Sequence, residues 1–203
     1  MIISMYKLLA ITNRHLCNND FLEQIQGICT LNQKNTGIKS VSIVLREKDL
    51  SEDDYKELAV KVLKICKKNN TECILHTYYK VAIELKCKKI HLPLHVLKSN
   101  PNIHKEFNEV GVSIHSVSEA IEAIDLGATY ITAGHIFATD CKKDIPPRGL
   151  SFLSSVCSCV NVPVYAIGGI SLSNAEKAIN AGADGICIMS GLMNCKDPRG
   201  FLF

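Results

Sequence analysis

Short apolar runs alternate with segments of helical periodicity along the whole chain, and this alternation is the strongest constraint on its fold. Glycine, proline or polar residues bound the apolar runs, which is typical of buried strands. The predicted strands are Lys7 to Thr12, Ser40 to Arg46, Glu72 to Thr77, Lys88 to Leu92, Gly111 to His115, Ala128 to Ala133, Val162 to Ile167 and Asp184 to Met189. The predicted helices are Phe21 to Leu31, the segment from Ser51 to about Lys68, Tyr79 to Leu85, Ser118 to Leu126, Leu150 to Val160 and Asn174 to Ala181.

Local signals mark some helix boundaries. Ser51 predicts an N-cap, and acidic residues follow it in the first helical turn. Ser173 is predicted to cap the helix Asn174 to Ala181. The segment from His95 to Val110 is the least regular, because Pro101 interrupts it.

Eight strand-plus-helix units in 203 residues predict a small (β/α)₈ TIM barrel, formed as a single domain over residues 1–203. The alternative is an open doubly wound sheet, but no G-x-G-x-x-G motif follows the first strand. After Pro198 only a few residues remain, so the eighth helix is expected to be short or missing. We expect a homodimer to cover the barrel surface that such a helix would leave bare.

Composition narrows the class of protein. The formal net charge is only +3 and the lysines are scattered, which gives a nucleic-acid partner little support. The N-terminal apolar stretch is interpreted as a first strand rather than a signal peptide, and no apolar run reaches membrane-spanning length. We therefore expect a cytoplasmic protein that binds no membrane.

The 10 cysteines form no C-x-x-C pair. Cys66, Cys73, Cys87 and Cys187 fall inside apolar helix or strand patterns, where cysteine behaves as a small buried hydrophobic residue in a reducing compartment. The Cys157-Ser-Cys159 segment is interpreted as two positions of a helix rather than as a metal site.

Polar residues collect where the predicted strands end, and in a barrel these carboxyl ends form the active-site face. The strand ends carry Arg46-Glu47-Lys48, His76-Thr77, His91 and Pro93, His115-Ser116, Gly134-His135, Gly168-Gly169 and Ser190-Gly191. The loop from Gly134 to Gly149 is long for a compact domain, and long loops of this kind are usually functional.

Two glycine turns predict a phosphate-binding site. In TIM barrels, the loops after strands seven and eight commonly bind phosphate. Here these turns contain Gly168, Gly169 and Gly191, with the hydroxyl of Ser190 beside them. Glycine lets the backbone approach a ligand closely, so we expect a phosphorylated small molecule.

The chain resembles the thiamine-phosphate synthase and TenI superfamily of small barrels along nearly its whole length. The resemblance is carried by Ala166-Ile-Gly-Gly-Ile, Asn180-Ala-Gly-Ala-Asp-Gly-Ile-Cys-Ile-Met-Ser-Gly, Asp197-Pro198 and Arg46-Glu47-Lys48. Synthases join a pyrimidine pyrophosphate to a thiazole phosphate with magnesium. They carry Asn-Asp-Arg at the end of strand three and Gly-Gln-x-Asp after strand four, whereas this chain has His76-Thr77-Tyr78 and Leu92-Pro93-Leu94-His95. The expected carboxylate ligands of magnesium are therefore missing.

The loop sequence Gly134-His-Ile-Phe-Ala-Thr-Asp-Cys-Lys-Lys143 is instead similar to the TenI-type thiazole tautomerase. In synthases a proline stands at the position of His135. The resemblance implies aromatisation of a carboxythiazole phosphate tautomer by proton transfer, without a metal or redox cofactor. Imidazole suits such a proton shift near neutral pH.

The resulting site hypothesis has three groups of residues. The catalytic residue is His135, with His76 and His115 as less favoured second imidazoles. The substrate-binding residues are Arg46, Lys48, Gly134, Thr139 and Lys142, and the phosphate-binding residues are Gly168, Gly169, Ser190 and Gly191. Either Arg46 or Lys48 could bind the substrate carboxylate. Two alternatives stay open, namely a thiamine-phosphate synthase and a non-catalytic, regulatory barrel that binds a thiamine intermediate.

Overall fold

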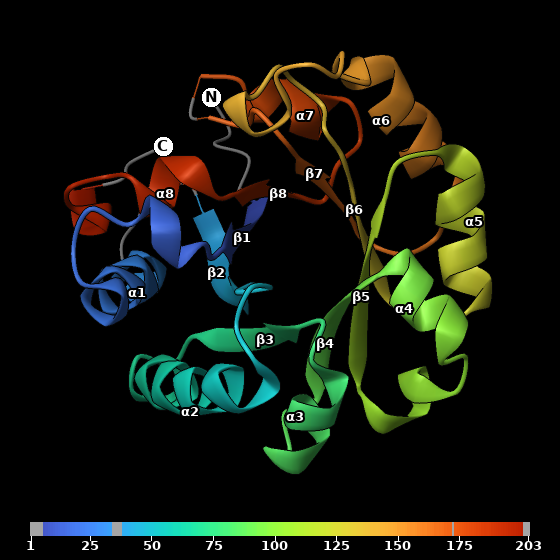
Figure 1. The fold of residues 1–203 in the computed structure, drawn as a ribbon. Coiled ribbons are helices and arrows are strands. Elements are labelled where there is room, and N and C mark those ends of the chain that lie inside the picture. The colour runs from blue at the N-terminus through green and yellow to red at the C-terminus, as the bar shows by residue number, and fades with distance from the viewer. Residues whose placement is uncertain (1–5, 34–37, 172, 201–203) are drawn as a thin grey trace. The chain divides into compact units, whose positions relative to one another are not determined.

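Eight strands alternate with helices in a computed structural model that describes residues 6–33, 38–171 and 173–200 (Figure 1). The strands are β1 (Tyr6–Ile11), β2 (Ile38–Leu45), β3 (Glu72–His76), β4 (Lys89–Pro93), β5 (Glu109–Ile114), β6 (Tyr130–Gly134), β7 (Val164–Ile167) and β8 (Gly185–Ile188). They pair in chain order into a closed barrel. This confirms the predicted (β/α)₈ fold and excludes the open-sheet alternative.

Helices follow the strands largely as predicted, but the helix Leu94–Ser99 was not predicted and lies mostly in the segment that the sequence marked as irregular. They are α1 (Phe21–Cys29), α2 (Glu52–Lys68), α3 (Tyr79–Glu84), α4 (Leu94–Ser99), α5 (Val117–Asp125), α6 (Gly149–Cys159), α7 (Ala175–Asn180) and α8 (Ser190–Met193). The final helix α8 is short, as expected. No helix in the described ranges is both long and apolar enough to span a membrane.

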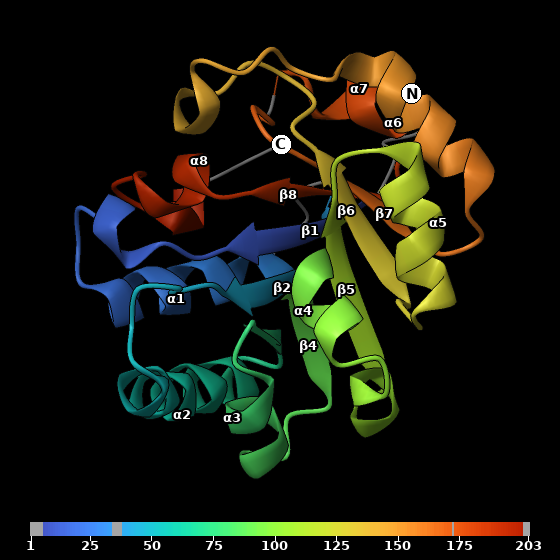
Figure 2. The ribbon, with the colours of Figure 1, turned by 45° about the vertical axis from the view of Figure 1, so that its right-hand side comes forward.

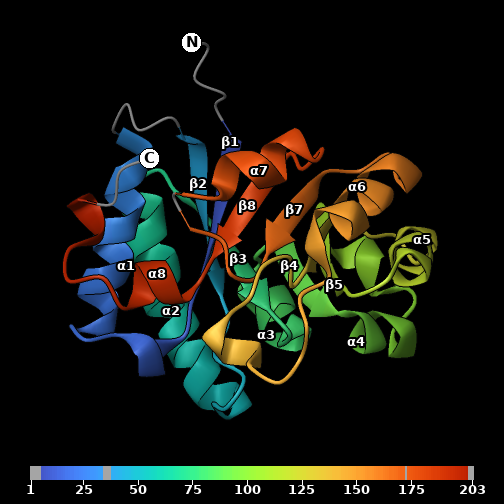
Figure 3. The same ribbon diagram turned by 90° about the horizontal axis from the view of Figure 1, so that it is seen from above.

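The chain forms two compact units, which we call the N-terminal unit (Met1–Lys89 with Ile188–Phe203) and the central unit (Ile90–Cys187). The expected single domain over residues 1–203 stays a prediction. In the N-terminal unit, β1, β2 and β3 are parallel neighbours, and α1 packs beside α2 (Figure 3). Asp20 caps α1 and Ser51 caps α2, as predicted for Ser51.

In the central unit, β5, β6 and β7 are parallel neighbours, and α5 packs beside α6 (Figure 2). The strand register places Ile114 opposite Ala133, and Gly134 opposite Ile167. The carboxyl ends of β5, β6 and β7 therefore lie at one edge of this sheet. The residues that follow them, including His115 and His135, are brought to the same edge.

Two sequence-based predictions need correction. Ser173 does not cap α7, because the N-cap is Asn174, whose side chain instead accepts a hydrogen bond from the backbone N–H of Ser171. His91 is not at the end of β4 but in its middle, where its imidazole is buried. In the irregular segment, α4 ends before Pro101, as the position of that proline requires.

The cysteines behave largely as predicted. Cys66, Cys73 and Cys187 are buried, whereas Cys87 is only partly buried. Cys157 and Cys159 are two positions of α6. Burial raises the pKa of the Cys157 thiol to about 11, which keeps that thiol protonated at neutral pH.

Candidate active site

His135 directly follows β6 and is buried, with 4% of its surface exposed. Its Nε2 atom lies 3.2 Å from the carbonyl oxygen of Ile145, which is in the same loop. A carbonyl oxygen can only accept, so Nε2 carries the proton of the neutral ring. The other ring nitrogen, Nδ1, then has a free lone pair and is the basic atom.

The backbone of the loop is tied down at both of its ends. The Ile136 N–H donates to the Ile167 carbonyl at 2.9 Å, and the Phe137 N–H donates to the Gly168 carbonyl at 3.0 Å. At the far end, the Arg148 N–H donates to the His135 carbonyl at 2.9 Å. The stem of the loop is thus fixed to β7 while residues 138–148 are mostly exposed.

The glycines of the central unit have a packing role that the sequence did not reveal. A Cβ atom at Gly168 would overlap the Cα and Cβ of His135, and one at Gly169 would overlap the carbonyl oxygens of Phe137 and Ala138. Gly168 and Gly169 also have positive φ values of 93° and 66°. Both glycines therefore allow the loop after β6 to pack directly on the turn after β7. Close approach to a ligand is not needed to explain them.

A second imidazole, that of His115, lies between a carboxylate and an ammonium group. Its Nε2 is 3.4 Å from Lys142 Nζ, and its Nδ1 is 3.6 Å from Glu119 Oε2. Burial, and then the charge of Lys142, lower the pKa of His115, whereas Glu119 acts in the opposite direction. Thr139, another predicted ligand-binding residue, accepts a hydrogen bond from the Cys141 N–H at 3.4 Å.

Glu119 was missed in the sequence, although a signal for it exists. Ser116 caps α5 and accepts from the Glu119 N–H, while the Glu119 carboxylate accepts from the His115 N–H at 2.5 Å. Ser-Val-Ser-Glu is the sequence pattern of a capping box. That pattern could have placed the Glu119 carboxylate beside His115.

His91 belongs to a buried polar network inside the central unit. Its Nδ1 is 3.0 Å from the Tyr130 hydroxyl, and its Nε2 is 2.8 Å from the Ser113 hydroxyl. Thr132 donates to the same Ser113 oxygen at 3.1 Å. Deep burial raises the pKa of Tyr130 well above its ordinary value, so its hydroxyl stays protonated at neutral pH. Both ring nitrogens of the buried His91 thus have hydrogen-bond partners, which explains its burial without a catalytic role.

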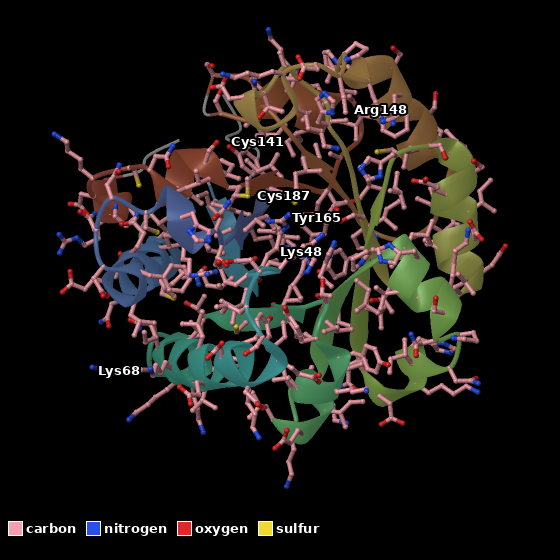
Figure 4. All side chains as sticks on the ribbon, in the orientation of Figure 1. Lys48, Lys68, Cys141, Arg148, Tyr165 and Cys187 are labelled. Carbon is pink, nitrogen blue, oxygen red and sulfur yellow. The ribbon has the colours of Figure 1, made fainter. Side chains whose placement is uncertain are left out.

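In the N-terminal unit, the residues after β2 separate into a buried acid and two cations. Glu47 is 2% exposed and accepts from the Thr12 hydroxyl at 2.6 Å and from the Arg14 guanidinium at 3.1 Å. Arg46 is half-buried. Lys48 is exposed and lies on the loop after β2 (Figure 4). Partial desolvation and the charge of Arg46 lower the pKa of Lys48. Arg14, which the sequence did not single out, anchors Glu47.

The residues at the ends of β3 and β4 do not reproduce the magnesium site that the resemblance implies for synthases. After β3, the His76 Nδ1 atom is 2.6 Å from the Thr77 hydroxyl, and β4 ends at Pro93. Magnesium prefers carboxylate and other hard oxygen ligands, which an imidazole and a proline do not supply. Across the described ranges, no cluster of three or more His, Cys, Asp or Glu side chains is arranged to hold a metal ion.

Ser190 and Gly191, the other part of the predicted phosphate site, begin α8 in the N-terminal unit. Ser190 is half-buried and Gly191 is exposed. Gly168 and Gly169 belong to the central unit. The phosphate-binding roles of all four residues stay predictions.

The fold defines a class of protein, namely the TIM barrels, and polar groups lie on the loops that follow its strands. A family model described as thiamine monophosphate synthase matches residues 8–192. The chain therefore belongs to the thiamine monophosphate synthase (TMP-TENI) family of thiamine biosynthesis.

Individual relatives agree with this membership. The chain is 33% identical to a thiamine-phosphate synthase of Clostridium acetobutylicum over 98% of its own length and 93% of that protein. It is also 33% identical to a putative thiamine-phosphate synthase 2 of Aquifex aeolicus, over 91% and 96% of the two chains. The structure of a Pyrococcus furiosus thiamine phosphate pyrophosphorylase matches with a TM-score of 0.76 at 25% identity, covering 99% of this chain and 94% of that chain. The names of these relatives favour the synthase alternative over the tautomerase hypothesis.

Proposed function

We propose that this chain is a metal-independent thiazole tautomerase that aromatises a carboxythiazole phosphate. The observation that carries the proposal is the environment of His135. Its Nε2 proton is committed to the Ile145 carbonyl, so Nδ1 is available as a base. An imidazole can both accept and return a proton, which suits a reaction that removes one proton and returns one.

The proposed reaction is balanced by a single proton. His135 Nδ1 accepts the proton from the ring carbon that bears the carboxylate, and the imidazole becomes imidazolium. The same nitrogen then gives a proton to the exocyclic carbon, which restores neutral imidazole and leaves an aromatic ring. No electron donor or acceptor takes part in this sequence of steps.

The substrate carries a carboxylate and a phosphate, and both need cations or N–H donors. In the central unit, Lys142 lies on the same loop as His135 and is half-buried. Its ammonium is our first candidate for one of these anions. Gly134, Thr139, Arg46 and Lys48 keep their proposed substrate-binding roles, and the phosphate-binding roles proposed above for the glycine turns and Ser190 are also kept.

Thiamine-phosphate synthase is the second candidate, and the names of the relatives favour it. The chemistry after β3 argues against it, because Thr77 stands where the resemblance places the magnesium-binding aspartate of synthases. A non-catalytic binding protein is disfavoured because binding alone has no need for a base at His135. The expected homodimer and cytoplasmic location stay predictions.

Two parallel assays distinguish these functions. The purified protein is incubated with the ylidene carboxythiazole phosphate in excess chelator, and the aromatic product is followed by proton NMR. In the second assay it receives hydroxymethylpyrimidine pyrophosphate, thiazole phosphate and magnesium. We expect turnover only in the first assay. Efficient formation of thiamine phosphate in the second assay, without tautomerisation in the first, would establish the synthase instead.

A further inference from the structure

Three charged or titratable side chains from three segments of the central unit form a chain of contacts. Glu119 lies on α5, His115 follows β5, and Lys142 lies on the short 3₁₀ turn of the loop after β6. The Lys142 ammonium is 3.4 Å from Nε2 of His115, and Glu119 Oε2 is 3.6 Å from Nδ1. The sequence separations of 27 and 4 residues show that the strand register, together with the loop conformation, brings them together.

The direction of these contacts follows from what each group can donate. A lysine ammonium has only donors, so Nε2 of His115 must be the acceptor and must be unprotonated. The single proton of the neutral ring is then on Nδ1, on the side that faces the Glu119 carboxylate. Glu119 is held in place because it also accepts the backbone N–H of His115 at 2.5 Å. His115 is therefore orientated from one side and presents an acceptor on the other.

Burial and the nearby cations favour the neutral form of His115. Burial lowers its pKa most, the positive charges of Lys142 and Arg148 lower it further, and Glu119 opposes them. At neutral pH the imidazole is therefore an acceptor for Lys142. When it gains a proton, it loses this acceptor and repels the ammonium.

We propose that His115 is a positioning residue that holds the Lys142 ammonium in place for the anionic substrate, with Glu119 setting the orientation of the imidazole. The proposal rests on the proposed function for the identity of that substrate. Lysine has a long, flexible side chain, and ordering it before binding reduces the entropy lost when the ligand arrives. His115 thus acts on substrate affinity through Lys142 and does not touch the reacting carbons.

The first test separates binding from chemistry in a set of variants. His115→Leu removes the acceptor but keeps the backbone N–H that binds Glu119, and His115→Gln offers a substitute carbonyl. We expect His115→Leu to raise the KM of the ylidene and the Kd of the aromatic product about three- to tenfold, the range for losing one net hydrogen bond, with kcat within about twofold. His115→Gln should recover much of this affinity.

A double-mutant cycle shows whether the effect passes through Lys142. In a Lys142→Met background, His115→Leu should cause little further loss of product affinity. Lys143→Met is the matched control, because Lys143 is the neighbouring lysine, 70% exposed, and its ammonium is 3.5 Å from Asp140. Equal losses from His115→Leu in the parent and in the Lys142→Met background would overturn the proposal.

A second test needs no ligand and so does not depend on the identity of the substrate. NMR titration gives the pKa of the His115 ring in the free protein. We expect Lys142→Met to raise that pKa, Glu119→Gln to lower it and Lys143→Met to leave it unchanged. If Lys142→Met leaves the pKa of the His115 ring unchanged, the contact between Lys142 and His115 is contradicted. If the pKa responds as expected but the thiazole is neither bound nor converted, the proposed function falls while the positioning of Lys142 by His115 stands.

Discussion

The imidazole Nε2 of His135 lies 3.2 Å from the carbonyl oxygen of Ile145, a residue of the same loop. Ile145 itself is 54% exposed. The buried histidine is therefore tethered to an exposed part of the loop. The contact selects the ring tautomer and leaves Nδ1 as the basic nitrogen. This relationship leads to the first prediction.

Replacing His135 with asparagine should abolish most of the proton transfer. Asparagine keeps a polar side chain of similar size but cannot accept and return a proton. We expect kcat to fall about 10²–10⁴-fold, with little change in the affinity for the aromatic product. The measurement is steady-state kinetics together with calorimetric binding. Near-parental turnover would transfer the catalytic role to another group, with His76 and His115 the next candidates.

Gly168→Ala should destabilise the fold more than Gly149→Ala. Both positions have positive φ, of 93° and 79°, which costs a residue with a Cβ about 1–2 kcal/mol. A Cβ at Gly149 has open space, whereas a Cβ at Gly168 overlaps His135. Because of this overlap, we expect Gly168→Ala to lower the free energy of unfolding by about 1–3 kcal/mol more than Gly149→Ala does. Urea unfolding of the two variants gives the comparison, and equal losses would contradict the packing role.

The packing of the loop after β6 on the turn after β7 also affects what a bulky substitution at Gly169 would show. From the sequence, such a substitution is expected to weaken phosphate binding while the fold persists. In the structure, a side chain at Gly169 meets the backbone oxygens of Phe137 and Ala138. Loss of ligand binding by a Gly169 variant would therefore not identify a phosphate site. Gly191 is the better position for that test, because it is exposed on α8.

Tyr130→Phe should destabilise the central unit without changing its shape. The variant removes the hydroxyl that lies 3.0 Å from Nδ1 of the buried His91. Losing a buried hydrogen bond of this kind costs about 1–2 kcal/mol of unfolding free energy. Chemical denaturation of the variant and the parent measures the difference. An unchanged midpoint and slope would show that the hydroxyl contributes nothing to stability.

Thr77→Asn should stabilise the protein. Thr77 has a φ of 66°, a left-handed conformation that is unfavourable for a β-branched residue and tolerated by asparagine. We expect the free energy of unfolding to increase by roughly 0.5–1 kcal/mol. Loss of the contact between the threonine hydroxyl and His76 would reduce this increase. Thermal unfolding compares the two proteins. A clearly less stable variant would show that the hydroxyl contact outweighs the backbone strain.

The pH dependence of stability should contain a contribution from His115. Its pKa in the folded protein is below the ordinary value of 6.5, so just below pH 6.5 the unfolded chain binds more protons than the folded chain. The free energy of unfolding should therefore fall as the pH decreases through this window and level off below the folded-state pKa. The difference between parent and His115→Gln, measured by denaturation across pH 5 to 8, isolates this contribution. A difference that does not vary with pH would argue against the lowered pKa.

The sequence by itself determined the order of the strands and of most helices, but not α4, because these predictions depend on local periodicity and on short-range signals. The apolar runs predicted all eight strands, and Ser51 predicted the cap of α2. Local signals were weaker where two neighbours compete for one role, as Ser173 and Asn174 do before α7. The sequence also placed His135 immediately after a strand, and strand ends in a barrel are where chemistry concentrates.

Only the tertiary structure decided what these residues touch. The contact of Gly168 with His135 depends on the pairing of β6 with β7, and the contact of Lys142 with His115 depends on both the β5–β6 register and the loop conformation. His91, which the sequence placed at a strand end, lies in the middle of β4 and contacts Tyr130 of β6 and Ser113 of β5 in a buried network. Periodicity constrains which residues form a strand, but it contains no information about atoms that meet across a long sequence separation. Such contacts set the environment of His115, and the folded conformation of the loop after β6 sets the tautomer of His135.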